Sequence, residues 1–162
     1  MANLQELKQR LVEYLSDSFS PSGVAVAGEF PASAKPSPLL KSRIAVGYDA
    51  MAVQSAGLDD YLGEDARETL RGRYVEITLR FTIACPVRLG GGSCQALFEG
   101  LLDALLLQSN EFGVEKLECG AVNYDKNAGG FVLCAKGKMN ALISAGETSL
   151  AIDEIELRRV IS

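Results

Sequence analysis

Histidine is absent from this chain of 162 residues. Its absence removes the commonest general base near neutral pH and the usual partner of a nucleophilic serine or cysteine. It also removes the ligand that completes a mixed cysteine and histidine zinc site. No catalytic or cofactor signature of real specificity occurs elsewhere in the sequence. We therefore expect a protein that is not an enzyme, with no catalytic site, no metal site and no cofactor.

Basic residues are outnumbered: 16 Lys and Arg face 21 Asp and Glu, which gives a formal net charge of −5. Nucleic-acid modules concentrate basic residues on one face, so we expect no specific nucleic-acid ligand. No apolar run approaches the roughly 20 residues of a membrane span. The first residues, MANLQELKQR, lack the basic start and apolar core of a signal peptide. These features predict a protein without a membrane partner that is cytoplasmic at synthesis.

Cysteine pairs with metal-binding spacing are also missing. The four cysteines, Cys85, Cys94, Cys119 and Cys134, form no CxxC motif. We predict that all four are free, buried and structural, because cysteine packs as a small hydrophobic residue. A redox pair and a four-cysteine metal site are the alternatives.

A strict two-residue alternation runs from Tyr74 to Cys85. It places apolar side chains on one face and mostly polar side chains on the other, as in an antiparallel sheet with one buried face. The apolar set is Val75, Ile77, Leu79, Phe81, Ile83 and Cys85. This pattern predicts the central strand of the fold.

Two amphipathic helices are predicted. The first begins near Asn3, with Glu6 as its capping-box acid, and its apolar stripe is Leu4, Leu7, Leu11, Tyr14, Leu15 and Phe19. The second follows Gly90, Gly91 and Gly92, and we expect Ser93 to cap it. Its stripe is Leu97, Leu101, Ala104, Leu105 and Gln108. We predict that Leu7, Leu11, Leu15, Leu97, Leu101 and Leu105 form the core with the central strand.

Further strands are expected at Val24 to Val26, Arg43 to Val53, and Thr148 to Ile161. Residues 113–125 and 130–141 read as a hairpin around a turn rich in Asn, Asp and Gly. The sequence thus predicts one α+β domain over residues 1–162. Two main helices pack on a mostly antiparallel sheet of about four to six strands.

Two segments fit no periodic element: a Pro-rich loop or arm at 28–42 and a charged flap at 57–73. Each is either a solvated connection or a contact segment, since long loops in compact domains are often functional. The final strand has acids first and bases last, so it could pair with a complementary edge or be an edge protected by charge. The candidate contact residues are Phe30, Leu39, Leu40, Leu58, Asp59, Asp60, Tyr61, Leu62, Glu64, Arg67, Arg71, Arg73, Ile155, Leu157, Arg158 and Arg159.

The glycines before the second helix also suggest an alternative function. Free amides at a helix N-terminus attract anions, so Gly90 to Ser93 could form a phosphate or ligand site, possibly in an enzyme. The P-loop lysine is missing, because Ser93 and Cys94 follow the glycines. We expect the glycines to turn the chain from strand to helix.

The order of these elements resembles a known family. A leading helix, a strand, a charged flap, VEITLRFTIACP, GGGSCQALFEGLLDALLL and the hairpin around LECGAVNYDKNAGGFVLCAKGKM occur in that order. This order resembles the tail terminator or tail-completion (neck or collar) proteins of phages and of phage-derived contractile particles of Gram-positive bacteria, over residues 40–143.

The resemblance implies a structural subunit without a cofactor. Such a subunit forms a ring of its own copies, with a hexamer expected, that caps the tail end and stops tail polymerisation. Its implied partners are itself, tube and sheath proteins, and neck or head-completion proteins. It would be incorporated into the particle after synthesis in the cytoplasm.

Overall fold

The computed structural model of the chain describes residues 4–29, 39–55, 61–65, 68–108, 111–147 and 155–159. At 55, 61–65, 68–73, 142–147 and 155–159 the description concerns the backbone alone.

Two helices form one layer of the fold. Helix α1 is Leu4–Phe19, and the short 3-10 turn η1 (Ser20–Ser22) follows it. Helix α2 is Gly92–Leu102, preceded by the 3-10 turn η3 (Val87–Leu89) and continued by the π-helical segment η4 (Asp103–Gln108).

The other layer is one sheet, in which the structure describes eight strands. They are β1 (Ala25–Gly28), β2 (Arg43–Ser55), β3 (Tyr61–Asp65), β4 (Glu68–Pro86), β5 (Val114–Cys119), β6 (Asn123–Asp125), β7 (Gly130–Glu147) and β8 (Ile155–Arg159). The main order is β1-β2-β4-β7-β5, while β3 pairs with β4, and β6 and β8 pair with β7. Among the described strands, β1 and β2 pair in parallel and all other pairs are antiparallel. The predicted α+β fold with two helices on a mostly antiparallel sheet is confirmed.

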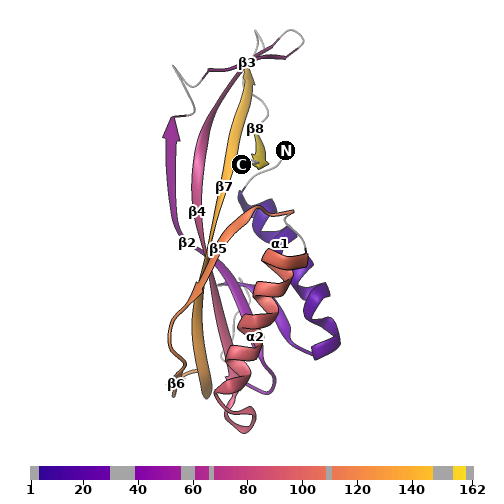
Figure 1. The fold of residues 1–162 in the computed structure, drawn as a ribbon, viewed down its shortest axis with the longest axis vertical. Coiled ribbons are helices and arrows are strands. Elements are labelled where there is room, and N and C mark those ends of the chain that lie inside the picture. Colours follow the sequence, from indigo (N-terminus) through magenta and orange to yellow (C-terminus); the bar gives the residue numbers. More distant parts are fainter. Residues whose placement is uncertain are drawn as a thin grey trace.

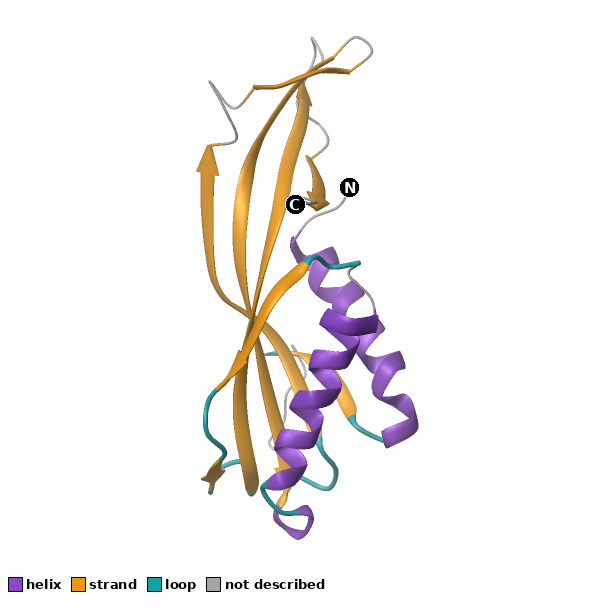
Figure 2. Ribbon diagram, in the orientation of Figure 1, coloured by secondary structure: helices purple, strands orange, loops and turns teal. Residues whose placement is uncertain are grey.

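Both helices lie on the same side of the sheet and cover one half of its length (Figure 1). The long strands β2, β4 and β7 continue beyond the helices as a narrow group of strands, with β8 beside them (Figure 2). The molecule is therefore elongated along its strands.

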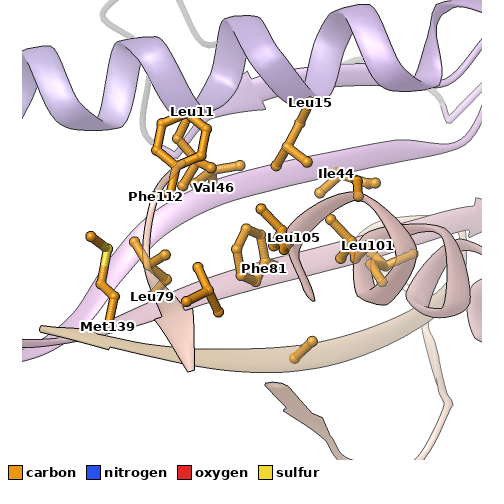
Figure 3. Packing of buried hydrophobic residues seen from close by; sticks show 14 of the residues in the cluster. Leu11, Leu15, Ile44, Val46, Leu79, Phe81, Leu101, Leu105, Phe112 and Met139 are labelled. Carbon is orange, nitrogen blue, oxygen red and sulfur yellow. The ribbon is translucent and has the colours of Figure 1, made fainter. Parts of the chain in front are cut away.

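The core lies between the helices and the covered half of the sheet. Figure 3 shows Leu11 and Leu15 of α1 directed toward the sheet, and Leu105 near Phe81 of β4. The predicted core is confirmed for all members except Leu97, which is only half-buried. The confirmed members are Leu7, Leu11, Leu15, Leu101, Leu105, Ile77, Leu79, Phe81 and Ile83.

The second helix differs from the expectation at both ends. It begins at Gly92 with Gly91 as the N-cap residue, and the Ser93 hydroxyl donates a hydrogen bond to the Gly90 carbonyl at 2.6 Å instead of capping the helix. At the other end, the π-helical segment has a longer repeat than an α-helix, which rotates the apolar stripe. Gln108, expected on the buried stripe, is exposed for that reason. The predicted cap at Asn3 lies outside the described residues.

The charged flap is more regular than the sequence indicates. Residues 61–65 and 68–73, expected within a long hairpin tip, belong to β3 and to the beginning of β4, which pair with each other. This part of β4 also pairs with β7, from Thr69 opposite Glu147 to Arg73 opposite Ile143. Pairing on both sides explains why a charged segment is extended, because strand formation depends strongly on its neighbours.

The cysteine prediction is right for two positions. All four thiols are free, and Cys85 and Cys94 are buried as expected. Cys119 and Cys134 are exposed, so the prediction that they are buried is wrong. Each lies in a strand with one solvent-facing side, where alternation brings every second residue to the surface.

Candidate interaction surfaces

The strands that extend beyond the helices form the most distinctive surface of the protein. We call this part the ribbon and define it as residues 50–55 of β2, 68–78 of β4, 138–147 of β7 and 155–159 of β8. The boundary is marked by an irregularity in the register of β2 between Tyr48 and Ala50. At the same level, the Tyr48 hydroxyl donates a hydrogen bond to the carbonyl of Leu4, the first described residue of α1. Burial raises the pKa of Tyr48 to about 12.

One edge of the ribbon has no partner strand among the described residues. Strand β1 pairs with β2 only from Arg43 to Val46, and the Glu29 amide then donates to the Val46 carbonyl at 2.8 Å. Beyond that bond, β2 has no strand on its outer side among the residues that the structure describes. The edge from Ala50 to Ser55 contains neither charge nor proline. Such an edge is a template for pairing with another strand.

Two apolar side chains on this edge are exposed to solvent. Met51 is 39% exposed and Val53 is 55% exposed, whereas their partners on β4, Ile77 and Val75, are buried. Below the register irregularity, Ile44 and Val46 of the same strand are buried under α1. The helical layer therefore ends before β2 does, and it leaves two apolar residues at the edge.

A charge network lies on the face of the sheet that the helices do not cover. The Arg80 guanidinium of β4 binds both carboxylate oxygens of Glu29, at 2.9 Å from Nε and 2.7 Å from Nη2. Asp49 of β2 lies between two bases, 3.5 Å from Arg80 Nη1 and 3.1 Å from Lys136 Nζ of β7. These contacts join three neighbouring strands at the base of the ribbon.

Glycine at position 47 makes room for this network. Gly47 lies opposite Arg80 in the sheet, and a Cβ atom built on it would stand 2.1 Å from Glu29 Oε2. The side chain of Glu29 is 12% exposed, so its carboxylate is largely withdrawn from water. Its hydrogen bonds and negative charge, followed by Asp49, raise the pKa of Arg80 above its ordinary value.

Strand β5 also has an outer edge, and that edge carries charges. Lys116 Nζ lies 2.9 Å from Glu118 Oε2, and the Asn140 amide donates to Glu115 at 3.1 Å. The Lys116 ammonium lowers the pKa of the Glu118 carboxyl. The charged side chains along this edge thus contact partners within the same subunit.

The arm contributes one exposed and one buried residue. Leu40 is 74% exposed, as expected of a contact residue. Leu39, expected to be a stray apolar group, is buried beside the start of β7, where its Cδ2 lies 2.8 Å from a Cβ built on Gly130. Near Leu40, whose carbonyl accepts a hydrogen bond from Arg88, the η3 residues Val87 and Leu89 are also exposed.

The remaining predicted contact residues fall into two groups. Five lie outside the described residues: Phe30, Leu58, Asp59, Asp60 and Arg67. The others are in the strands of the ribbon or of its β3 hairpin. Tyr61, Leu62 and Glu64 belong to β3, Arg71 and Arg73 to β4, and Ile155, Leu157, Arg158 and Arg159 to β8.

Sequence reasoning missed the β2 edge and the charge network. Met51, Val53, Gly47, Glu29 and Asp49 carry no motif, and their roles depend on which strands are neighbours. The absence of charge from Ala50 to Ser55 was visible in the sequence. It becomes informative once β1 is known to end at Gly28.

Several polar groups of the glycine turn before α2 make hydrogen bonds within the turn. Gly90 has a φ of 78°, which favours glycine, so the turn prediction is confirmed there. The Ser93 and Cys94 amides donate to the carbonyls of Gly90 and Gly91 at 3.3 and 3.2 Å. Burial, with Cys85 beside it, raises the pKa of the Cys94 thiol to about 12. A thiol with this pKa is a poor nucleophile.

Among the described residues, no group of three or more His, Cys, Asp or Glu side chains could hold a metal ion. Within the same residues, no helix has the length and apolar character needed to cross a membrane. The chain matches no protein-family model and no curated protein sequence.

Proposed function

We propose that this protein is a structural subunit that assembles with its own copies into a ring, and that the ring closes the end of a phage tail or a related contractile particle. In this role it stops tail polymerisation and joins the tube or sheath to neck proteins. A hexamer is the expected ring, and the protein is not an enzyme.

The observation that carries the proposal is the ribbon with its free β2 edge. A long, uncharged edge with exposed Met51 and Val53 is a hazard in a protein that stays monomeric. The same edge is useful in a protein that adds copies side by side. The β5 edge, in contrast, carries Glu115, Lys116 and Glu118, which already contact polar partners within the subunit.

The order of elements supports the place of this ring in a tail. The leading helix, strand, charged flap, long strand, turn, helix and hairpin on which the resemblance to tail-completion proteins rests follow one another in this order along the chain. The negative net charge of −5 per subunit also suits a ring through which DNA passes, because like charges repel.

A ligand site at Gly90 to Ser93 is the competing function. The engaged amides of Ser93 and Cys94 weigh against it, since an anion at a helix N-terminus needs free donors. The high pKa of Cys94 weighs against a nucleophilic thiol there.

The test is the mass of the purified protein by light scattering, combined with negative-stain images. We expect particles with six-fold symmetry that do not bind phosphate or nucleotides. A monomer at all concentrations would contradict the proposal, and a monomer that binds phosphate would favour the competing function.

A deletion tests the contribution of the flap. Removing residues 60–71 takes away β3 and the first part of β4, but no residue of the described core. We expect a folded protein that no longer forms rings or caps tails. Normal rings and tails of normal length with this variant would show that the flap is only a solvated segment.

A further inference from the structure

We propose that residues 50–55 of β2 bind strand β8 of a second copy, in antiparallel orientation, so that the ribbons of neighbouring subunits form one continuous sheet. This inference rests on the proposed ring and names the contact that builds it.

Residues 50–55 of β2 offer backbone N–H and C=O groups to a further strand. Every second residue of an edge strand directs its N–H and C=O away from the sheet. From Ala50 to Ser55, these groups have no partner strand among the described residues. Proteins that remain monomeric block such an edge with charge, proline or a covering segment. Neither charge nor proline occurs between Ala50 and Ser55 in the sequence, and no strand of the described residues covers this edge.

The directions of the strands allow β8 of a second copy to pair antiparallel with β2. Across the ribbon, β2, β4, β7 and β8 are each antiparallel to the next. The first and last of four alternating strands run in opposite directions. A copy placed beside the first by rotation about an axis along the strands therefore brings β8 antiparallel to β2. The pairing pattern of the sheet continues without a break.

The two edges also lie at the same height along the ribbon. Ser55 lies opposite Arg73, Arg73 opposite Ile143, and Ile143 opposite Leu157. A second row joins Val53 to Arg159 through Val75 and Ala141. The free part of β2 and strand β8 thus occupy the same rows on opposite sides of the ribbon. Neighbouring copies can meet edge to edge without a large shift along the strands.

The residue pattern fits the same partner. On β2, the exposed apolar residues Met51 and Val53 alternate with Ala52 and Gln54. In β8, Ile155 and Leu157 alternate with Glu156 and Arg158. Apolar residues of paired strands stabilise a sheet when they are neighbours on one face. Because two different edges meet, the contact is head-to-tail, and such contacts produce rings when the rotation closes.

Cross-linking between two kinds of copies tests the contact. In a chain with C119S and C134S, which removes the exposed thiols, one sample carries V53C and a second carries L157C. After mixing and assembly, a short bismaleimide should join the two kinds of copy. The matched control pairs L157C with L107C, because Leu107 is 70% exposed but belongs to η4 and not to either paired edge. The control should give no cross-link.

Edge blocking and hydrogen exchange give an independent readout. We expect V53K to shift the protein from rings to folded monomers, while L107K still assembles. In rings of the unmodified chain, the amides of residues 50–55 should exchange more slowly than in the V53K monomer.

The ring and the contact between β2 and β8 can fail independently in these experiments. Rings that show fast exchange at residues 50–55 and no V53C to L157C cross-link would overturn the β8 contact and leave the ring intact. Cross-linking of V53C copies to one another would overturn it in favour of a symmetric β2 contact. An unmodified chain that stays monomeric would overturn both proposals.

Discussion

Replacing Gly47 by alanine should destabilise the protein, although the same change usually has the opposite effect. A glycine whose backbone an alanine can also adopt is normally improved by about 0.4–1 kcal/mol, because alanine restricts the unfolded chain. Gly47 is not among the glycines with positive φ, so the backbone itself allows alanine. The obstacle is Glu29, whose Oε2 would lie 2.1 Å from the new methyl group.

The magnitude follows from what Glu29 must give up. Its carboxylate accepts two hydrogen bonds from Arg80, at 2.9 and 2.7 Å. Losing hydrogen bonds to a charged group costs about 1.5–3 kcal/mol. Because the Arg80 side chain is 32% exposed and keeps Asp49, we expect the lower part of that range. After the gain from alanine is subtracted, the net loss is about 1 kcal/mol, or roughly 2–4 °C in Tm for a chain of this size.

A double-mutant cycle isolates this mechanism. We expect Gly47→Ala to lower the urea midpoint in the parent chain but to raise it slightly in a Glu29→Ala chain, where nothing opposes the methyl group. The m-value, which is the slope of the unfolding free energy against urea concentration, should stay unchanged, so that the shift in midpoint reports a change in stability. Equal effects of Gly47→Ala in the two chains would refute the reasoning, because the cost would then not pass through Glu29.

Three further predictions concern the core and the thiols. Leu101→Ala should lower the free energy of unfolding by about 2–5 kcal/mol because Leu101 is fully buried. The control Leu107→Ala should change it by no more than about 0.5 kcal/mol. An unchanged Tm for Leu101→Ala would refute the place of Leu101 in the core. In the native protein a thiol reagent should modify Cys119 and Cys134 but not Cys85 and Cys94, as peptide mass spectrometry can check; modification of all four at equal rates would contradict this. Burial raises the pKa of Cys94 from 9.0 to about 12, so the folded state keeps a proton that the unfolded chain loses, and stability should fall as pH rises from about 9 toward 12. Cys94→Ala should weaken this decline in urea titrations, and an equally steep decline would show that other groups cause it.

The elements that the sequence predicted well are those with a strong period. Leu7, Leu11 and Leu15 repeat at helical spacing, and Ile77 to Ile83 alternate, so local pattern and burial agree. The extended start of β4 was not predictable, because Glu68 to Arg73 are held by pairing with β3 and β7 and not by their own composition. Gln108 was misplaced for a related reason, since a π-helical segment leaves no clear sign in the sequence.

The contact surfaces were harder to predict than the core. The expected contact residues were chosen because they had no periodic element to bury them, and Leu39 shows how that criterion fails: it packs beside Gly130, far away in the sequence. The β2 edge shows the opposite failure. Met51 and Val53 lie in the strand expected over Arg43 to Val53 and are partnered by buried residues of β4, but the helical layer ends before it reaches them.

The boundary between the helix-covered half of the sheet and the ribbon has a mechanical consequence for the proposed assembly. The charge network joins β2, β4 and β7 at the base of the ribbon, through Asp49 with Arg80 and Lys136. The strands are thereby fixed in direction at the point where the helices end. An edge that is already held in position loses less conformational entropy on pairing than a segment that must first become ordered. In the proposed ring, the network would therefore favour pairing by positioning the β2 edge, although none of its charged residues lies between Ala50 and Ser55.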